Sequence, residues 1–306
     1  MISLENKIKI VSLFSGGGFL DMGFEKAGFE VVFSNEIDKD FAKFYEEGMS
    51  SWAGEPKKIS HIGPAEKTNL SVIEKNREFP FGIIGGPPCQ DFSIRGMKNG
   101  FDGLRGTLTF HFYERVLDLQ PDFFLMENVP GLVLLKKTKT AFNSILDLFR
   151  QDYDIDLKQL NALHYGVPQN RMRLFVFGIK RNITNSLKNN LEKECIFDWP
   201  SPLYPNAENI YKWGEPESRT YENTLFSLPA PPPNLCVQHI LIGRGDQQII
   251  KNAGEFFMIK NINKIKEIEE GDTYRPSFKR LHRKKYSPAA CYGNNEVHLH
   301  PFYDRR

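Results

Sequence analysis

An alternation of short apolar runs with helical patterns over residues 8–180 constrains the fold of this chain most strongly. The apolar runs predict strands over Ile8–Phe14, Val31–Ser34, Phe81–Gly85, Phe123–Met126 and Leu174–Ile179. The helical patterns predict helices over Phe19–Ala27, Asp38–Glu47, Leu108–Leu119 and Thr140–Phe149. Strands that alternate with helices in this way form a parallel sheet covered on both faces. We therefore predict an α/β fold with a doubly wound, mostly parallel sheet.

The regular pattern ends near residue 185, where prolines become frequent. Trp199–Pro202, Pro205 and Pro231–Pro233 interrupt the chain, and the apolar periodicity is lost. The triple proline is open to a second interpretation as a linker. We predict three parts: a first domain over residues 1–184, a smaller irregular domain over 185–285 and a final segment over 286–306.

Residues 85–90, with the sequence GGPPCQ, follow the apolar strand predicted over Phe81–Gly85. Two prolines cannot continue a strand, so the chain must turn there. Cys89 then lies at the carboxyl edge of the sheet, where a nucleophile is expected in an α/β fold. Taken alone, a small buried apolar cysteine is the better interpretation. Three further segments of the chain favour the nucleophile.

The sequence FSGGG over Phe14–Gly18 joins the first predicted strand to the first predicted helix. Small residues let a ligand approach the helix N-terminus, although a tight structural turn explains them equally well. The dinucleotide fingerprint G-x-G-x-x-G is not completed, because Asp21 follows Gly16 and Gly18 at its third position. Glu36 ends the next strand, 20 residues after Gly16, where an acid can bind ribose hydroxyls. The pattern favours a nucleoside cofactor without a pyrophosphate over NAD.

Cysteine usage and the N-terminus bear on the compartment. The four cysteines, Cys89, Cys195, Cys236 and Cys291, lie far apart and lack metal-ligand spacing. We therefore expect no disulfide framework and no metal site, as in a reducing cytosol. The first six residues lack a basic start followed by an apolar core, and no apolar run approaches membrane-spanning length. We expect a soluble, cytoplasmic protein.

The charge distribution is uneven toward the end of the chain. The segment Thr273–Asn295 contains no acidic residue. Its basic residues are Arg275, Lys279, Arg280, Arg283, Lys284 and Lys285. A polyanionic partner would favour such a segment, although a solvated loop is the default interpretation of a short charge run.

Four blocks stand in one order along the chain: Phe14–Gly18 (FSGGG), Pro87–Gln90 (PPCQ), Glu127–Val129 (ENV) and Gln169–Arg173 (QNRMR). In this order and spacing they resemble the DNA (cytosine-5) methyltransferase family, of the bacterial restriction–modification type. The resemblance covers about residues 8–180 and resumes near 279–306. It implies a Rossmann-like class I methyltransferase fold, S-adenosylmethionine as cofactor and double-stranded DNA as partner. The three predicted parts would then be a catalytic, cofactor-binding domain, a target-recognition domain and the start of a segment that returns to the catalytic domain.

The resemblance implies methyl transfer to carbon 5 of cytosine. Carbon 5 is a poor nucleophile until a thiolate adds to carbon 6, and Cys89 would supply that thiolate. The addition places negative charge on the ring, so an acid at N3 would stabilise the transition state; by resemblance that acid is Glu127. Arg173 would hold the cytosine O2, and Arg171 would brace the catalytic loop or Glu127. A surface pair beside a strand is the alternative interpretation of both arginines.

The resemblance also assigns ligand contacts. The cofactor-binding residues are Phe14, Ser15, Gly16, Gly18, Glu36, Ile37, Asn69, Pro87 and Leu108. The DNA-binding residues are Gln90, Ser93 and Arg95, after the cysteine, and Arg244 in a predicted recognition loop. Arg244 in an ordinary turn and Leu108 in plain core remain open interpretations. Asn69 stands where the family has an aspartate, and its amide oxygen can still accept from the adenine amino group.

The family continues beyond the blocks found here, so we expect a truncated product or one half of a split enzyme. An apolar face near Val11, Leu13 and Phe19 would then be uncovered and would bind a second chain. Two alternative functions stay open, an RNA (tRNA) cytosine-5 methyltransferase and an inactive DNA-binding half of a split methyltransferase. An NAD-dependent oxidoreductase is disfavoured by Asp21.

Overall fold

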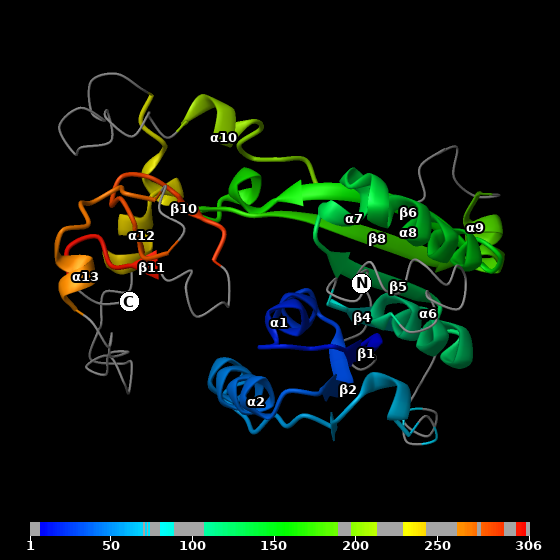
Figure 1. The fold of residues 1–306 in the computed structure, drawn as a ribbon. Coiled ribbons are helices and arrows are strands. Elements are labelled where there is room, and N and C mark those ends of the chain that lie inside the picture. The colour runs from blue at the N-terminus through cyan, green and yellow to red at the C-terminus, as the bar shows by residue number, and fades with distance from the viewer. Residues whose placement is uncertain are drawn as a thin grey trace. The chain divides into compact units, whose positions relative to one another are not determined.

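The computed structural model contains two compact units (Figure 1). The first unit comprises Met1–Gln159 and Arg173–Trp199, and the second comprises Leu160–Met172 and Pro200–Arg306. The boundaries predicted at residues 184 and 285 stay predictions. The structure describes residues 7–69, 71, 73, 80–88, 107–188, 197–212, 229–242, 262–273, 277–290 and 298–303.

The first unit is built on a seven-stranded sheet with the order β3-β2-β1-β4-β5-β8-β6. Its strands are β1 (Lys9–Leu13), β2 (Glu30–Glu36), β3 (His61–Ile62), β4 (Phe81–Gly85), β5 (Phe123–Asn128), β6 (Tyr153–Asn161) and β8 (Met172–Lys180). The pairs from β3 through β5 are parallel, whereas β5 and β8 are antiparallel. The predicted mostly parallel sheet is confirmed.

Two strands of this sheet, β3 and β6, have no counterpart among the predicted strands. β3 has two residues, whereas β6 has nine. The apolar residues Tyr153, Ile155 and Leu157 of β6 alternate with acidic or basic ones, so it contains no continuous apolar run. Alternation of this kind is typical of a strand with one solvated face. This alternation with period two is visible in the sequence. The prediction of strands relied instead on continuous apolar runs such as those of β1 and β4.

Helices flank the sheet, and four of them overlap the four predicted helices. The helices are α1 (Phe19–Lys26), α2 (Lys39–Ala53), α6 (Leu108–Leu119), α7 (Gly131–Leu134), α8 (Lys136–Phe149) and α9 (Arg181–Lys188), with short 3₁₀ turns η1 (Ala65–Lys67) and η3 (Ala162–Tyr165). The start of α2 is defined by Asp38, whose carboxylate accepts hydrogen bonds from the backbone N–H groups of Asp40 and Phe41. Its end is defined by Gly54 in a left-handed conformation.

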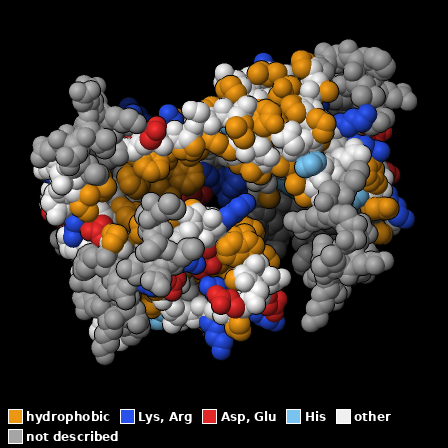
Figure 2. Space-filling view, turned by 180° about the vertical axis from the view of Figure 1, so that it is seen from behind, with side chains coloured by type: hydrophobic (Ala, Val, Ile, Leu, Met, Phe, Trp, Pro, Cys, Tyr) orange, Lys and Arg blue, Asp and Glu red, His pale blue; other side chains and the backbone are white. Residues whose placement is uncertain are grey.

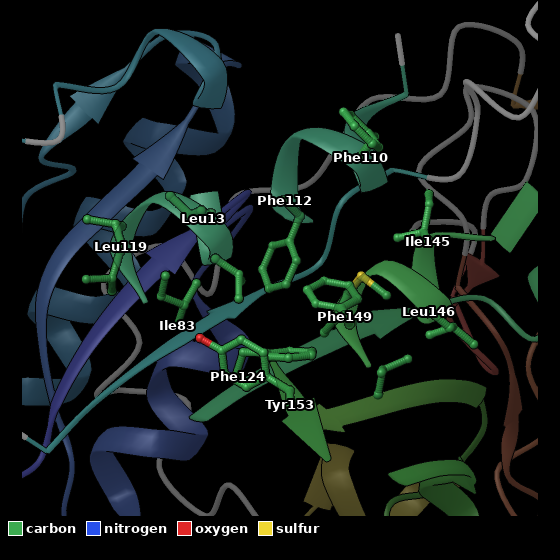
Figure 3. Close-up of a cluster of buried hydrophobic side chains, with 14 of the residues drawn as sticks. Leu13, Ile83, Phe110, Phe112, Leu119, Phe124, Ile145, Leu146, Phe149 and Tyr153 are labelled. Atoms are coloured by element: carbon green, nitrogen blue, oxygen red, sulfur yellow. The ribbon is translucent and has the colours of Figure 1, made fainter. Parts of the chain in front are cut away.

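The main core lies between the sheet and the helices α6 and α8 (Figure 3). Phe124 of β5 stacks on Phe149 of α8 with ring centroids 4.4 Å apart, and the edge of Tyr153 meets it at 5.2 Å. Phe112 of α6 approaches the same ring at 6.3 Å. Pairs of this kind add about 0.5–1.5 kcal/mol each beyond area burial, so they hold α6 and α8 against the sheet.

The second unit has short elements and small apolar clusters. Its elements are β7 (Gln169–Asn170), α10 (Ala207–Ile210), η5 (Pro233–Leu235), α12 (Val237–Ile242), α13 (Asn263–Lys266), β9 (Lys279–Arg280), β10 (Ser287–Pro288) and β11 (His298–Leu299), with η3 also in this unit. β7 pairs with β10 and β9 with β11, both in parallel. One cluster gathers around Leu163 and Leu235, and another around Ile265 and Leu299.

The prediction of an uncovered apolar face is wrong for two of its three residues. Val11 and Leu13 are 1% and 0% exposed, because β1 lies between β2 and β4 in the middle of the sheet. Phe19, at the start of α1, is 66% exposed. None of the helices in the described ranges is long and apolar enough to cross a membrane.

Candidate active site

The strand order places a topological switch point between β1 and β4. The chain runs from β1 outward through β2 to β3, and then returns to β4 on the other side of β1. Loops at the carboxyl ends of strands diverge at such a point, which leaves a place for a ligand. The ends of β2 and β5 and the loops after β1, β2 and β4 carry several of the predicted site residues.

The glycine-rich loop Phe14–Gly18 takes an unusual backbone path. Phe14, Gly16 and Gly18 have φ values of 54°, 53° and 82°. A bulky residue such as Phe14 rarely adopts a positive φ, and outliers of this kind cluster at ligand sites. A Cβ added at Gly16 would meet no atom within 4 Å, so open space lies beside this residue.

Glu36 ties two loops together at the end of β2. Its Oε2 accepts from the backbone N–H of Gly16 at 2.7 Å. Its Oε1 accepts from the N–H groups of Ile37 at 2.8 Å and Asp38 at 2.9 Å. The Glu36 side chain is buried, while Ile37 beside it is 62% exposed. The carboxylate therefore sets the spacing between the loops after β1 and β2.

Glu127 lies near the end of β5, beside the loop that leads to Cys89. Its Oε1 forms an ion pair with Arg173 Nε at 2.7 Å, which the antiparallel pairing of β5 and β8 brings into reach. A Cβ added at Gly86 would lie 3.1 Å from Glu127 Oε2, so the carboxylate lies against that glycine. A larger residue at position 86 would press on Glu127.

Asn128 fastens the same two loops to each other. Its side chain is 3% exposed, and its Nδ2 donates to the carbonyl oxygen of Pro87 at 2.8 Å. Its Oδ1 accepts from the N–H of Val129. The block Glu127–Val129 and the Pro87–Pro88 turn are thus held together, 41 residues apart in the chain. The predicted site residues outside the described ranges are Cys89, Gln90, Ser93, Arg95 and Arg244.

The two arginines of the QNRMR block fall in different units. Arg173 begins the returning part of the first unit and pairs with Glu127. Arg171 belongs to the second unit, where its N–H donates to Asn161 Oδ1 and its Nη1 lies 3.5 Å from the carbonyl oxygen of Ala290. We expected Arg171 to brace the catalytic loop or Glu127, and in the structure Arg173 contacts that carboxylate. The roles of both toward the base stay predictions.

The model of one family, C-5 cytosine-specific DNA methylase, matches residues 8–303. The chain belongs to this family. Its reaction class is accordingly that of a DNA (cytosine-5)-methyltransferase, and the family implies S-adenosylmethionine as cofactor and DNA as substrate.

Among known proteins, the chain is 37% identical over 316 residues to M.NmeDI, a type II methyltransferase of Neisseria meningitidis serogroup C. That match covers 98% of this chain and 72% of the relative. It is 41% identical over 182 residues to the type II methyltransferase M.NgoPII of Neisseria gonorrhoeae, covering 58% of this chain and 50% of that protein. M.FnuDI of Fusobacterium nucleatum is 36% identical over 67% of this chain and 54% of its own length. The chain thus spans about half the length of two of these three relatives.

Solved structures share the fold. An E. coli prophage protein described as a DNA modification methyltransferase superposes with a TM-score of 0.59 at 24% identity, over 98% of this chain and 85% of that one. The S. pombe Dnmt2 methyltransferase superposes with a TM-score of 0.53 at 12% identity, over 95% of this chain and 73% of that one. At these identities the likeness concerns the fold.

Two predicted cofactor residues of this methylase-family chain have local structural partners. The Oδ1 of Asn69 accepts from the N–H of Ser71 at 3.1 Å and from its hydroxyl at 2.8 Å. The amide oxygen is therefore engaged by its neighbour rather than presented alone. Leu108 opens α6 and is half-buried, next to Thr107, whose Oγ1 caps the helix.

A buried polar network, not predicted from the sequence, lies behind the glycine-rich loop. Asp21 is 0% exposed, and it accepts from Ser12 Oγ at 2.6 Å and from the hydroxyl of Tyr45 at 2.8 Å. Burial raises the pKa of Asp21 to about 6, although the two hydroxyls oppose this shift. The sequence feature that could have indicated this network is Asp21, an acidic residue in the first turn of α1.

Proposed function

We propose that this chain transfers a methyl group from S-adenosylmethionine to carbon 5 of a cytosine flipped out of a specific double-stranded DNA sequence. The reaction proceeds through a covalent bond between Cys89 Sγ and carbon 6 of the base. One observation supports this proposal most strongly: Asn128 fastens the Glu127 block to the Pro87 turn, two residues before Cys89. An acid and a nucleophile that act on one base need this proximity.

The protein groups have separate parts in the chemistry. The Cys89 thiolate forms the S–C6 bond, and the electron pair displaced from the C5–C6 double bond makes carbon 5 nucleophilic. Glu127 donates a hydrogen bond or a proton to N3, where the negative charge develops, and Arg173 holds the Glu127 side chain in place through Oε1. The cofactor supplies the methyl group. Loss of the proton from carbon 5 then breaks the S–C6 bond and returns the thiolate.

The residues after β1 and β2 fit a nucleoside cofactor. A carboxylate has about four acceptor sites. Three of those of Glu36 accept from backbone N–H groups, and the fourth can accept from a ribose hydroxyl. The exposed side chain of Ile37 offers an apolar surface beside that carboxylate. The space beside Gly16 lets a ligand approach the loop backbone.

A mechanism-based trap tests the proposal. DNA that contains 5-fluorocytosine should hold the protein in a stable covalent complex, because fluorine cannot leave carbon 5 as a proton. Cys89→Ser should lose that complex entirely, visible as the loss of a shifted band on a denaturing gel. Cys236→Ser is the matched control, since this buried thiol only donates weakly to the carbonyls of Pro231 and Pro232.

An adduct that survives Cys89→Ser would overturn the assignment of the nucleophile. The same assay with tRNA separates DNA from RNA as the substrate, since transfer to tRNA alone would overturn the DNA assignment. Activity of residues 1–306 by themselves would show that no second chain is required.

A further inference from the structure

Three elements of the first unit meet at one buried carboxylate. Asp21 lies in the first turn of α1, Ser12 on β1 and Tyr45 on α2. Both hydroxyls donate to the carboxylate, Ser12 to Oδ1 and Tyr45 to Oδ2. Among the described residues, no Lys or Arg forms an ion pair with Asp21. A buried acid whose described hydrogen bonds come from neutral groups costs stability when it ionises, so its position calls for an explanation beyond packing.

The network continues into the glycine-rich loop through a second serine. Ser12 Oγ lies 3.0 Å from Ser15 Oγ. A hydroxyl has one proton, and Ser12 gives its proton to Asp21, so Ser15 is the donor in the contact between the two serines. The Ser15 hydroxyl also lies 3.5 Å from the carbonyl oxygen of Ser12. The ionised carboxylate therefore turns the Ser15 proton inward, toward the sheet. The two lone pairs of Ser15 Oγ face away from that hydrogen bond and can accept.

Tyr45 links the same network to the end of the loop. A Cβ added at Gly18 would lie 2.8 Å from the Tyr45 ring, so the ring lies directly against this glycine. Asp21 thus reaches the loop by two routes, through the serines to its start and through the tyrosine to its end. The loop conformation with three positive φ values is held between them.

We propose that Asp21, acting through Ser12 and Ser15, is a positioning residue that favours the positively charged methyl donor over its neutral-sulfur product. This inference rests on the proposed binding of S-adenosylmethionine at the glycine-rich loop. The donor carries a sulfonium charge that disappears on methyl transfer, whereas the rest of the molecule is unchanged. A buried negative charge near the loop, and an acceptor whose direction it sets, stabilise the cation more than the thioether.

Equilibrium binding of S-adenosylmethionine and S-adenosylhomocysteine, each measured by calorimetry, tests the proposal without turnover. Asp21→Asn should weaken binding of the donor about tenfold, the effect of one hydrogen bond to a charged group, and weaken binding of the product less. The ratio of the dissociation constant of the product to that of the donor should therefore fall. Ser15→Ala, which removes the acceptor itself, should lower the ratio in the same direction.

Glu25→Gln is the matched control, because it removes one negative charge from the same helix. Glu25 pairs with Lys57 at 3.3 Å and has no hydrogen bond to the serines among the described contacts. It should leave the ratio unchanged. Tyr45→Phe removes one hydroxyl from Asp21 but keeps the ring against Gly18 and leaves both serines in place. It should therefore weaken the binding of the two ligands by the same factor and leave the ratio unchanged.

An unchanged ratio in Asp21→Asn would overturn the proposal, even if Ser15→Ala lowers the ratio. If Asp21→Asn does not fold, as judged by circular dichroism, Ser12→Ala replaces it, since loss of the Ser12 hydroxyl breaks the same relay. Absence of donor binding by the unchanged protein would instead defeat the proposed function, so the two failures are distinguishable.

Discussion

The two units differ in the buried charges that their backbones bind. Backbone N–H groups bind a buried carboxylate in the first unit, and backbone carbonyl oxygens bind buried cations in the second. In the first unit Glu36 is buried and accepts from three backbone N–H groups at the strand ends. In the second unit Arg280 is 5% exposed and donates to the carbonyl oxygens of Ile265, Ile268, His300 and Tyr303. Lys285 is 2% exposed and donates to the carbonyl of Lys212.

The difference follows from the length of the secondary structure. Loops at the carboxyl ends of parallel strands turn their N–H groups toward the site, so an acid is the fitting partner there. The helices α10 and α13 have four residues each, so few of their carbonyls find partners within the helix. Cations from the basic segment fill that role, which shows that a unit with little regular structure can be held together by buried arginine and lysine.

The largest effect is expected from Arg280→Met in the second unit. The substitution removes four hydrogen bonds and leaves the carbonyls of Ile265 and Ile268 without this donor. We expect a loss of about 3–5 kcal/mol in the free energy of unfolding of this unit. Urea unfolding followed by circular dichroism measures it. Arg150→Met, at an exposed pair with Asp147, is the control and should change little. A loss under about 1 kcal/mol for Arg280→Met would break the comparison.

A pH effect is expected from Asp21 in the first unit. Its folded pKa of about 6 exceeds the ordinary 3.8, so the folded state binds more protons between these values. The stabilisation is present below about pH 4 and is lost as the pH rises through about 6, a fall of about 3 kcal/mol. The groups facing Asp21 are Tyr45 on α2 and Glu25 on α1, the latter paired with Lys57.

Denaturant unfolding between pH 4 and 7 measures this fall, with Asp21→Asn as the comparison. The variant should lack the slope in this window while keeping the slopes of other groups. Parallel curves for the two proteins would contradict the assigned pKa shift.

Glu36→Ala should weaken binding of S-adenosylmethionine about tenfold or more. One well-formed bond to a charged group contributes roughly 1.5–3 kcal/mol, and the loss also releases the Gly16 loop. Calorimetric titration measures the dissociation constant. Asp40→Ala, at the exposed start of α2, should bind the cofactor as the unchanged protein does. Normal binding by Glu36→Ala would place the ribose elsewhere.

The smallest effect is expected from Lys285→Met. Burial lowers the pKa of Lys285, and within the described part of the chain a single carbonyl bond to its Nζ offsets the cost of burying the charge. An apolar side chain of similar length should change the free energy of unfolding by no more than about 1 kcal/mol in either direction. A loss comparable to that of Arg280→Met would show that the number of carbonyl bonds does not decide which buried cation stabilises this unit.

Prediction from the sequence succeeded where a segment has one strong local preference. The bounds of β4 (Phe81–Gly85) and α6 (Leu108–Leu119) agree with the prediction residue for residue. A continuous apolar run marks the first, and a Thr cap with apolar positions on one face marks the second. β6 was not predicted because its apolar residues alternate with polar ones, so it contains no continuous apolar run.

The basic segment shows how tertiary contacts can reverse an interpretation. Neither a solvated loop nor a polyanion-binding stretch describes Arg280, Arg283 or Lys285. Arg283 forms a two-pronged pair with Glu270 and lies 3.7 Å from the Phe302 ring centroid, and the other two are buried. On the face drawn in Figure 2, Lys and Arg side chains lie among hydrophobic and acidic ones. Charge in a sequence does not show which cations are already used within the fold.

The sequence by itself determined the α/β class, the family and the order of the four blocks, because these depend on local periodicity and on residue types at fixed spacings. Only the tertiary structure decided that Arg173 pairs with Glu127, that Asn128 holds the Pro87 turn, and that a buried acid lies behind the glycine-rich loop. Each of these contacts joins side chains on different strands or helices. The geometry that forms them comes from strand direction and helix packing, which no local stretch of sequence encodes.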